Sequence, residues 1–392
     1  MLLARSFFAL AVAMFLSAQA QATAGCSRAA LADAASGVRQ ARTALIAVPV
    51  GEMDTDVPPG ASAALEHLKD RLQAYVRISM ACMPSSASVK SIAARLKAQG
   101  DAGKRGPDTD GHGRDLDYSV DPLPNHPGWI TIVPSFDIQC GSDAIALFYR
   151  RDSARWREAM VLRAAPYKEV SGGWEGVDIT ASPAGADGRW YVALARRTPW
   201  CTSTWSAYHL MLARPTANPF RPDIFLKRDL SYNRGYNTAI AATPRWFEVR
   251  LVDWSHDIDI LVRTSIHRWA IDGDRTRRIP PVAPTAQDFV DEWLETPWRE
   301  ASAWSATSLK ALHNQLGFAD GNQKDVGTSF DQIRACPRNR IEVALQPEAG
   351  PDYYLMVEQK GVAFRLTGVS RRHDARCTGP DQKHQHPLLG DQ

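Results

Sequence analysis

The segment "WITIVPSFDIQCGSDAIALFYRRDSARWREAMVLRA" (129–164) contains three short runs that are rich in apolar and aromatic residues. Short runs of this composition, bounded by polar segments, are typical of β-strands. The first run ends at Pro134, and proline suits the end of a strand because it cannot donate a hydrogen bond to the ladder. The segment therefore predicts a meander of a short strand, an aromatic-rich strand and a third strand.

The same form recurs three times along the chain. The further units are "DITASP…RWYVALAR…AYHLMLAR" (178–214), "TAIAATP…RWFEVRLVDW…DIDILVRTS" (238–265) and "IEVALQP…DYYLMVEQ…VAFRLTGV" (341–369). A fourth strand follows some units, as in "PDIFLKRD" (222–229). Four-stranded meanders that repeat every ~40 to 50 residues are typical of propeller blades. We therefore expect a mainly β repeat domain over 127–372, with propeller-like meanders and a β-sandwich as the alternative.

The second unit carries a resemblance to a known type of repeat. Its stretch "ITASPAGADGRWYVAL" (179–194) resembles the strand–SPDG–strand opening of blades in SPDG-type β-propellers. Ser182, Pro183 and Gly188 match that pattern, with an insertion between them. The resemblance covers one short stretch and implies a fold and no particular activity.

Helical periodicity dominates residues 25–100. Leu65, Leu68 and Leu72 follow steps of three and four, which place them on one stripe of a helix. A second helix precedes this one, and the loop-type connector between them predicts an antiparallel hairpin. Residues 101–126 are rich in Gly, Asp and Pro and are expected to form a linker.

Two further segments stand apart from the repeats. Residues 285–316 have helical character, and Thr285 with Asp288 resembles a capping box. We expect the aromatic side chains of Phe289, Trp293, Trp298 and Trp304 to pack this insertion onto the sheets. Residues 378–392 show no pattern and are expected to form a disordered tail.

The N-terminus has the layout of a secretory signal. Arg5 precedes an apolar run that is too short to span a membrane, and small residues follow it. We expect residues 1–24 to be a cleaved signal peptide and the mature protein to be periplasmic or secreted, without a transmembrane segment.

All six cysteines follow the expected signal peptide, and an even number in an exported chain indicates disulfides. In a helical hairpin Cys26 would lie beside Cys82, and Cys336 and Cys377 flank the fourth unit. The remaining pair, Cys140 and Cys201, would link loops of the first two units.

The charges are nearly balanced, with 46 basic and 43 acidic residues. Such a balance does not favour nucleic acid or an anionic membrane as a partner. The sequence also contains no nucleophile elbow, zinc-protease helix, phosphate-binding loop or dinucleotide fingerprint. We expect no cofactor and no metal site.

The densest group of polar residues is "LVDWSHDIDILV" (251–262). Loop aspartates and serines accept hydrogen bonds from nearby amides, so the segment can be a hairpin tip and nothing more. In a catalytic interpretation, His256 is a general base that Asp253 or Asp257 orients.

Tryptophan supplies the other candidate site. In a meander, the loops between second and third strands lie at one end of every unit, which would bring Trp156, Trp200, Trp205 and Trp254 to one rim. An exposed aromatic rim suits the binding of glycans or peptides. Alternatively, the rings fold inward and cover the ends of the sheets.

Two functions from different classes follow from these patterns. The sequence favours an exported, disulfide-bonded binding or scaffold protein of a bacterial-type envelope, with a glycan or an envelope protein as its partner. The alternative is a hydrolase of envelope polymers that uses His256 and the neighbouring aspartates.

Overall fold

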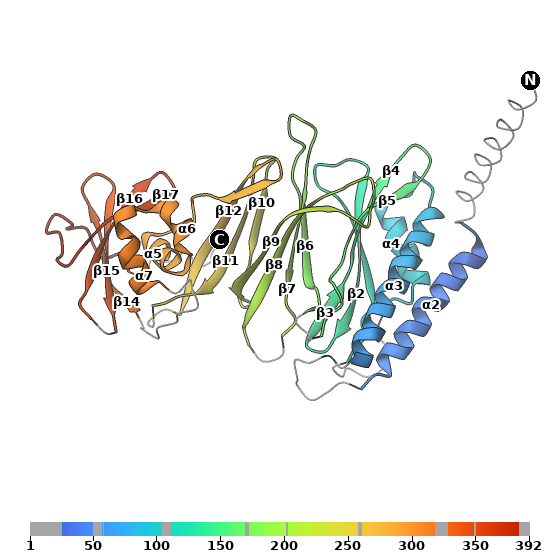
Figure 1. Ribbon diagram of the computed structural model, residues 1–392. Coiled ribbons are helices and arrows are strands. Elements are labelled where there is room, and N and C mark those ends of the chain that lie inside the picture. Colours follow the sequence, from blue (N-terminus) through green and yellow to red (C-terminus); the bar gives the residue numbers. More distant parts are fainter. Residues whose placement is uncertain are drawn as a thin grey trace, which may run out of the picture. The chain divides into compact units, whose positions relative to one another are not determined.

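The computed structural model describes residues 26–49, 57, 59–103, 111–168, 172–200, 203–257, 261–317, 328–348 and 350–383. These residues form four antiparallel sheets, a helical N-terminal region and a helical insertion (Figure 1). The mainly β class predicted from the sequence is confirmed. The expected signal peptide, residues 1–24, lies outside the described residues. The chain divides into two compact units, each of which contains more than one of the sequence repeats. The first unit lies mainly before Arg228 and the second mainly from Arg228 onward.

The first unit begins with a helical hairpin and a third helix. They are α2 (Arg28–Ile46), α3 (Pro59–Ala81) and α4 (Val89–Gln99). The side chains of Ser27 and Ser88 accept hydrogen bonds from the first-turn amides of α2 and α4, which fixes where these helices begin. The predicted leucine stripe of α3 is fully buried.

A five-stranded sheet follows in the same unit, with the order β1-β2-β4-β5 and with β3 paired to β2. Its strands are β1 (Asp117–Pro122), β2 (Trp129–Ile138), β3 (Gly141–Ala144), β4 (Ala146–Arg151) and β5 (Trp156–Leu162). Helices and sheet share one apolar core, in which Leu72, Tyr118, Ile132 and Leu147 are buried.

This shared core differs from the separate helical domain and linker that the sequence predicts. The expected linker, 101–126, contains β1, and β1 pairs with β2 along its whole length. Tyr118 and Val120 alternate with polar residues and bury their side chains. The physical reason is that an apolar helix stripe needs an apolar partner, and the first sheet provides it.

The other three sheets are four-stranded meanders in chain order. The second has β6 (Glu175–Ala181), β7 (Val192–Arg197), β8 (Trp205–Arg214) and β9 (Asp223–Asn233). The third has β10 (Ala239–Ala242), β11 (Trp246–Trp254), β12 (Val262–Asp272) and β13 (Arg275–Arg278). The fourth has β14 (Thr328–Cys336), β15 (Arg340–Pro347), β16 (Tyr353–Lys360) and β17 (Ala363–Ser370).

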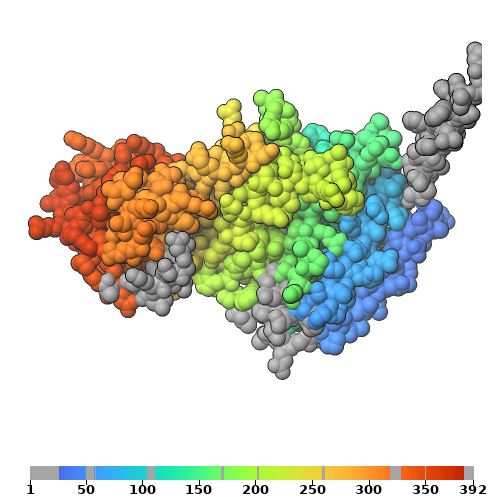
Figure 2. All heavy atoms as spheres, viewed as in Figure 1, coloured from blue at the N-terminus to red at the C-terminus, as the bar shows by residue number. Residues whose placement is uncertain are grey.

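The insertion lies between the third and fourth sheets in the sequence, within the predicted range. It consists of α5 (Ala286–Glu295), α6 (Trp298–Ala301), two short 3-10 turns (Ser302–Trp304 and Thr307–Leu309) and α7 (Lys310–Leu316). Phe289, Trp293 and Trp304 are buried in one core with Leu345 and Leu366 of the fourth sheet, and Trp298 packs against that core. Figure 2 shows the insertion in orange at the surface, beside the C-terminal sheet in red.

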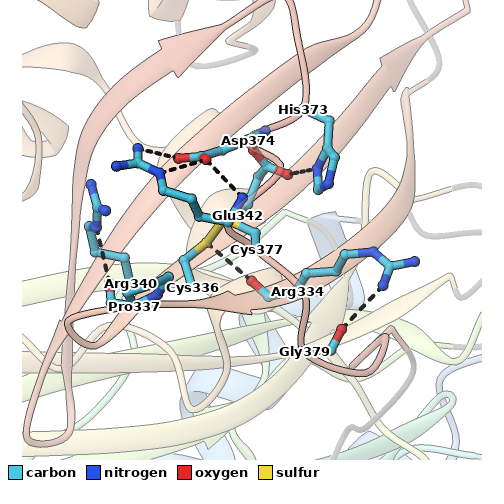
Figure 3. Close-up of a disulfide and its surroundings, with 10 residues drawn as sticks. Arg334, Cys336, Pro337, Arg340, Glu342, His373, Asp374, Cys377 and Gly379 are labelled. Carbon is cyan, nitrogen blue, oxygen red and sulfur yellow. Dashed lines mark hydrogen bonds and ion pairs between the residues drawn. A yellow bond between two sulfur atoms is a disulfide. The ribbon is translucent and has the colours of Figure 1, made fainter.

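Two disulfides are present among the described residues, and both are pairs that the sequence predicts. Cys26–Cys82 joins the start of α2 to the end of α3, with a Cα–Cα distance of 5.0 Å. Cys336–Cys377 joins the end of β14 to the segment after β17, with a Cα–Cα distance of 4.1 Å (Figure 3). The predicted Cys140–Cys201 pair includes Cys201, which lies outside the described residues, so this pair stays a prediction.

Hydrogen bonds hold the segment after β17 to the fourth sheet. The carboxylate of Glu342 contacts the imidazole of His373 at 2.5 Å and accepts from the amide of Asp374 at 2.8 Å (Figure 3). Further along, Asp381 accepts from the amide of Ile333 at 2.9 Å. The range 378–392, which the sequence predicts to be a disordered tail, thus begins with residues that are hydrogen-bonded to β14.

Candidate functional site

The polar site of the second unit starts on the third sheet. On β12, Arg263, Ser265 and His267 occur at every second position and therefore lie on one face of the strand. In the register with β11, Asp253 pairs with Arg263 and belongs to the same face. All four residues are buried.

Helix α5 covers this face with its own polar stripe. Asp288, Asp291, Glu292 and Glu295 follow steps of three and four, which place them on one side of the helix. Thr285 caps the helix by accepting from the amide of Asp288, as the predicted capping box requires. Because α5 packs against β12, the carboxylates of the helix meet the basic residues of the strand.

Arg263 is the centre of the resulting network. Its Nε donates to the carbonyl of Trp254 at 3.0 Å, and its Nη1 donates to Glu292 at 2.5 Å. Its Nη2 donates to Glu295 at 2.9 Å and lies 3.6 Å from Oδ2 of Asp253. The guanidinium group is fully buried, so these carboxylates supply the charge compensation that water supplies at a surface.

Glu292 connects this network to β13. One of its oxygens accepts from Arg278 at 2.5 Å and from Thr296 at 3.1 Å, and the other accepts from Ser265 at 2.9 Å in addition to Arg263. Burial alone would raise the pKa of Glu292, but Arg278 and Arg263 outweigh it and hold that pKa well below its usual range. Glu292 is therefore ionised and held in place.

Two other carboxyl groups have raised pKa values. Burial raises the pKa of Asp253 to about 7, against the opposing effect of Arg263 and with added repulsion from Glu295. Burial likewise raises the pKa of Asp291 to about 6. Burial and the nearby Arg278 lower the pKa of His267 well below 6.5, so its imidazole is neutral.

Asp253, Arg263 and His267 line a cavity of about 310 Å³, together with Arg278, Glu292 and Glu295. Its walls come from β9, β11, β12, β13, α5 and the start of the next helix. The lining residues are Arg228, Asp229, Leu230, Ser231, Asp253, Arg263, His267, Trp269, Arg278, Glu292, Glu295, Thr296, Pro297 and Glu300. The volume suits a ligand the size of one sugar unit or one amino acid.

Three polar atoms of the lining lack a hydrogen-bond partner among the described residues: Oδ2 of Asp253, Nε of Arg278 and Oε1 of Glu295. Asp253 is 5% exposed, and its Oδ1 accepts from the amide of Trp254 at 2.8 Å. Its Oδ2 has only Arg263 nearby, at 3.6 Å, which is beyond hydrogen-bond distance. Nε of Arg278 is buried without a hydrogen-bond acceptor, and Glu300 lies 3.8 Å from it.

The structure separates the three candidate catalytic residues. Asp253 lines the cavity, whereas His256 and Asp257 are absent from its lining. Nε2 of His256 lies 3.1 Å from Oε1 of Glu295, and its side chain is 3% exposed. Asp257 is fully buried and accepts from Gln287 at 3.3 Å. The carboxylate seen beside Nε2 of His256 therefore belongs to Glu295 of α5.

The four candidate rim tryptophans differ in their surroundings. Trp156 is buried in the core of the first unit, so it cannot serve as an exposed platform. Trp200 and Trp205 are half-buried. Trp254 is 36% exposed at the end of β11, and its ring lies 4.4 Å from that of His256 in an edge-to-face arrangement. The burial of Trp156 matches the alternative in which rings fold inward.

Sequence reasoning missed Arg263, Arg278, Glu292 and Glu295. Two signals in the sequence point to this network. One is the polar residues at every second position of β12, and the other is the acidic residues at helical spacing in α5. Each signal alone is also typical of a solvated face. Only the packing of α5 on β12 reveals that the two stripes face each other.

Metal binding, membrane crossing and similarity to known proteins also bear on function. Among the described residues, no three histidine, cysteine or acidic side chains are arranged to hold a metal ion. None of the described helices is long and apolar enough to cross a membrane. The chain matches no known family model, and no curated protein matches it either.

Proposed function

We propose that this chain is an exported, disulfide-bonded binding protein of a bacterial-type envelope, with its ligand site in the cavity beneath α5. The observation that carries this proposal is a cavity lined by polar atoms without hydrogen-bond partners, among them Oδ2 of Asp253, which lies 3.6 Å from Arg263, and the buried Nε of Arg278. A buried polar group without a partner is costly, and a bound polar ligand removes that cost. The two disulfides are compatible with an extracellular or periplasmic protein.

A screen of small polar molecules against the mature protein tests this proposal. We expect glycan fragments or amino acids to raise the melting temperature by binding the folded state. Ser231 is exposed and lines the cavity, so Ser231→Trp should obstruct it and remove the shift. Ser153→Trp, at an exposed position of the first unit, is the matched control. A shift that survives Ser231→Trp would contradict the cavity as the site.

Export rests on the signal-like N-terminus. N-terminal sequencing of the protein recovered outside the cytoplasm should give a chain that begins shortly after residue 24. An intact Met1 in that fraction would contradict cleavage. The expected partner is an envelope glycan or an envelope protein: the small-molecule screen tests the glycan, and affinity capture from an envelope extract tests the protein.

A hydrolase of envelope polymers is the second candidate, because two carboxyl groups of the cavity approach the same nitrogen of Arg263. Asp253, with its raised pKa, can hold a proton beside the carboxylate of Glu295, and such a pair performs general acid–base chemistry. His256 would orient Glu295 from behind. Release of soluble fragments from purified cell-wall polymer, lost in Glu295→Gln, would support this function over simple binding.

We also retain a propeller-like arrangement of the four meanders as a proposal. It is supported by the chain-order pairing of β6 to β9, β10 to β13 and β14 to β17, each of which has the form of one blade. Small-angle scattering of the mature protein tests it. A profile that fits a two-layer sandwich would contradict it.

A further inference from the structure

We propose that the cavity binds a small hydroxylated amine, such as an amino sugar, whose ammonium group pairs with Asp253 and whose hydroxyl group accepts from Arg278. This inference rests on the proposed function, because it names the chemical class of the ligand for the same cavity.

The charge of the lining favours a cation. It contains five acidic residues, Asp229, Asp253, Glu292, Glu295 and Glu300, against three arginines, Arg228, Arg263 and Arg278. His267 also lines the cavity but is neutral, because its pKa lies well below 6.5. The excess of carboxyl groups favours positive ligands over anions, and a cation bound beside Asp253, whose pKa is about 7, would also favour the ionised form of that group.

Some of these charged groups already form hydrogen bonds with other residues of the protein. All three nitrogens of the Arg263 guanidinium donate to protein oxygens, and both oxygens of Glu292 accept two hydrogen bonds each. Both residues are held by several hydrogen bonds to the protein and shape the wall of the cavity. They offer a ligand few hydrogen-bond donors or acceptors, so the neighbouring groups of the lining would recognise it.

Asp253 is the group with capacity for an ammonium ion. Its Oδ2 lacks a hydrogen bond from the described residues, and Arg263 at 3.6 Å is shared with Glu295. A protonated amine placed against Oδ2 would form a charge-assisted hydrogen bond in a buried environment, where such bonds are strong. The raised pKa of Asp253 has the same origin, because the carboxylate is buried with too little positive charge nearby.

Arg278 and Trp269 add the requirement for a hydroxylated ring. Nε of Arg278 is a buried donor that needs an acceptor, and a ligand hydroxyl oxygen is such an acceptor. Trp269, which is 3% exposed, contributes apolar ring surface to the same lining. A sugar ring offers hydroxyl groups at its edge and an apolar face, so it matches a wall of this kind.

Three sugars with the same ring and different charge test the inference on the mature protein: glucosamine, glucose and glucuronate. By calorimetric titration at neutral pH, glucosamine should bind at least about tenfold more tightly than glucose, which corresponds to one well-placed ionic hydrogen bond. Glucuronate should bind more weakly than glucose.

Two variants test whether the preference for glucosamine depends on the carboxylate of Asp253. Asp253→Asn should make glucosamine and glucose bind equally, because it removes the negative charge and keeps the shape. Asp272→Asn, at the exposed end of the neighbouring strand β12, should keep the tenfold preference.

The outcomes separate this inference from the proposed function. Glucose or glucuronate binding as tightly as glucosamine overturns the amine and leaves the cavity as a binding site. If none of the three sugars binds while another small molecule does, in a manner that Ser231→Trp blocks, the inference is likewise overturned and the proposed function stands. Both fail if no small polar molecule binds.

Discussion

The two compact units each contain a buried cluster of charges, and the clusters differ in one respect. In the first unit, Nζ of Lys69 lies 2.5 Å from Glu66 and 3.1 Å from Asp143, above the ring of Tyr167. In the second unit, Arg263 makes comparable contacts with Glu292 and Glu295. Lys69 and Arg263 are both buried on all sides.

The difference lies in what surrounds the charges. Oδ1 of Asp143 accepts from the amides of Ala144 and Trp174, and its Oδ2 lies 3.1 Å from Nζ of Lys69, so each charge has a close partner of opposite charge within the cluster. The Arg263 cluster instead borders a cavity and includes Asp253, whose Oδ2 lies 3.6 Å from an arginine that Glu295 also contacts. Buried charge alone therefore indicates a structural role, whereas buried charge beside open space and an unmatched group indicates a ligand site.

The largest effect is expected from Arg263→Met, which removes the cation that Glu292 and Glu295 share and leaves the buried Glu292 with Arg278 alone. We expect a loss of about 3 to 5 kcal/mol in the free energy of unfolding, measured by urea denaturation. Arg250→Met, on the opposite face of β11 and partly exposed, should cost less than about 1 kcal/mol. Equal losses would mean that the buried network contributes nothing beyond packing.

The matched cluster should respond to single and double substitution differently. Lys69→Met leaves Asp143 buried without its cation and should cost about 3 kcal/mol. Adding Asp143→Asn should recover most of this loss, because Asn keeps the acceptor for Ala144 and Trp174 and removes the charge. A double variant as unstable as Lys69→Met would contradict a charge-based explanation. Urea denaturation again supplies the measurement.

The unmatched carboxyl group should make stability depend on pH. The pKa of Asp253 is raised from 3.8 to about 7 in the folded state, so its contribution is present below pH 4 and is lost as pH rises toward 7. Asp253→Asn should therefore equal the wild type near pH 4 and exceed it by on the order of 3 kcal/mol at about pH 8. Comparing the two proteins at each pH removes the contribution of His267, and a difference that stays constant with pH would contradict this assignment.

The smallest effect is expected at the edge of the site. Trp254→Ala should change the free energy of unfolding by less than about 1 kcal/mol, because over a third of the ring is already in solvent. Trp156→Ala should cost about 3 to 5 kcal/mol, as for a buried aromatic side chain. Similar losses in thermal melts of both variants would restore the hypothesis that the two rings share one role.

The sequence by itself determined the local elements of this protein. Period-two alternation predicted the meanders, helical spacing predicted the hairpin, and Thr285 with Asp288 predicted the start of α5. Two disulfides followed as well, because the hairpin and the fourth unit each bring their cysteines together through nearby chain. The strands and helices depend on residues close in sequence, which leave a pattern that can be read directly, and each disulfide follows from the hairpin or the meander that those elements form.

Only the tertiary structure decided the site. The acidic stripe of α5 looks from its sequence like a solvated helix face, and nothing in it names Arg263 as its partner. The same holds for β1, whose burial depends on helices that precede it in the chain. The physical reason is that burial and charge pairing are properties of faces that pack together, and the spacing within one element fixes a face without fixing what covers it.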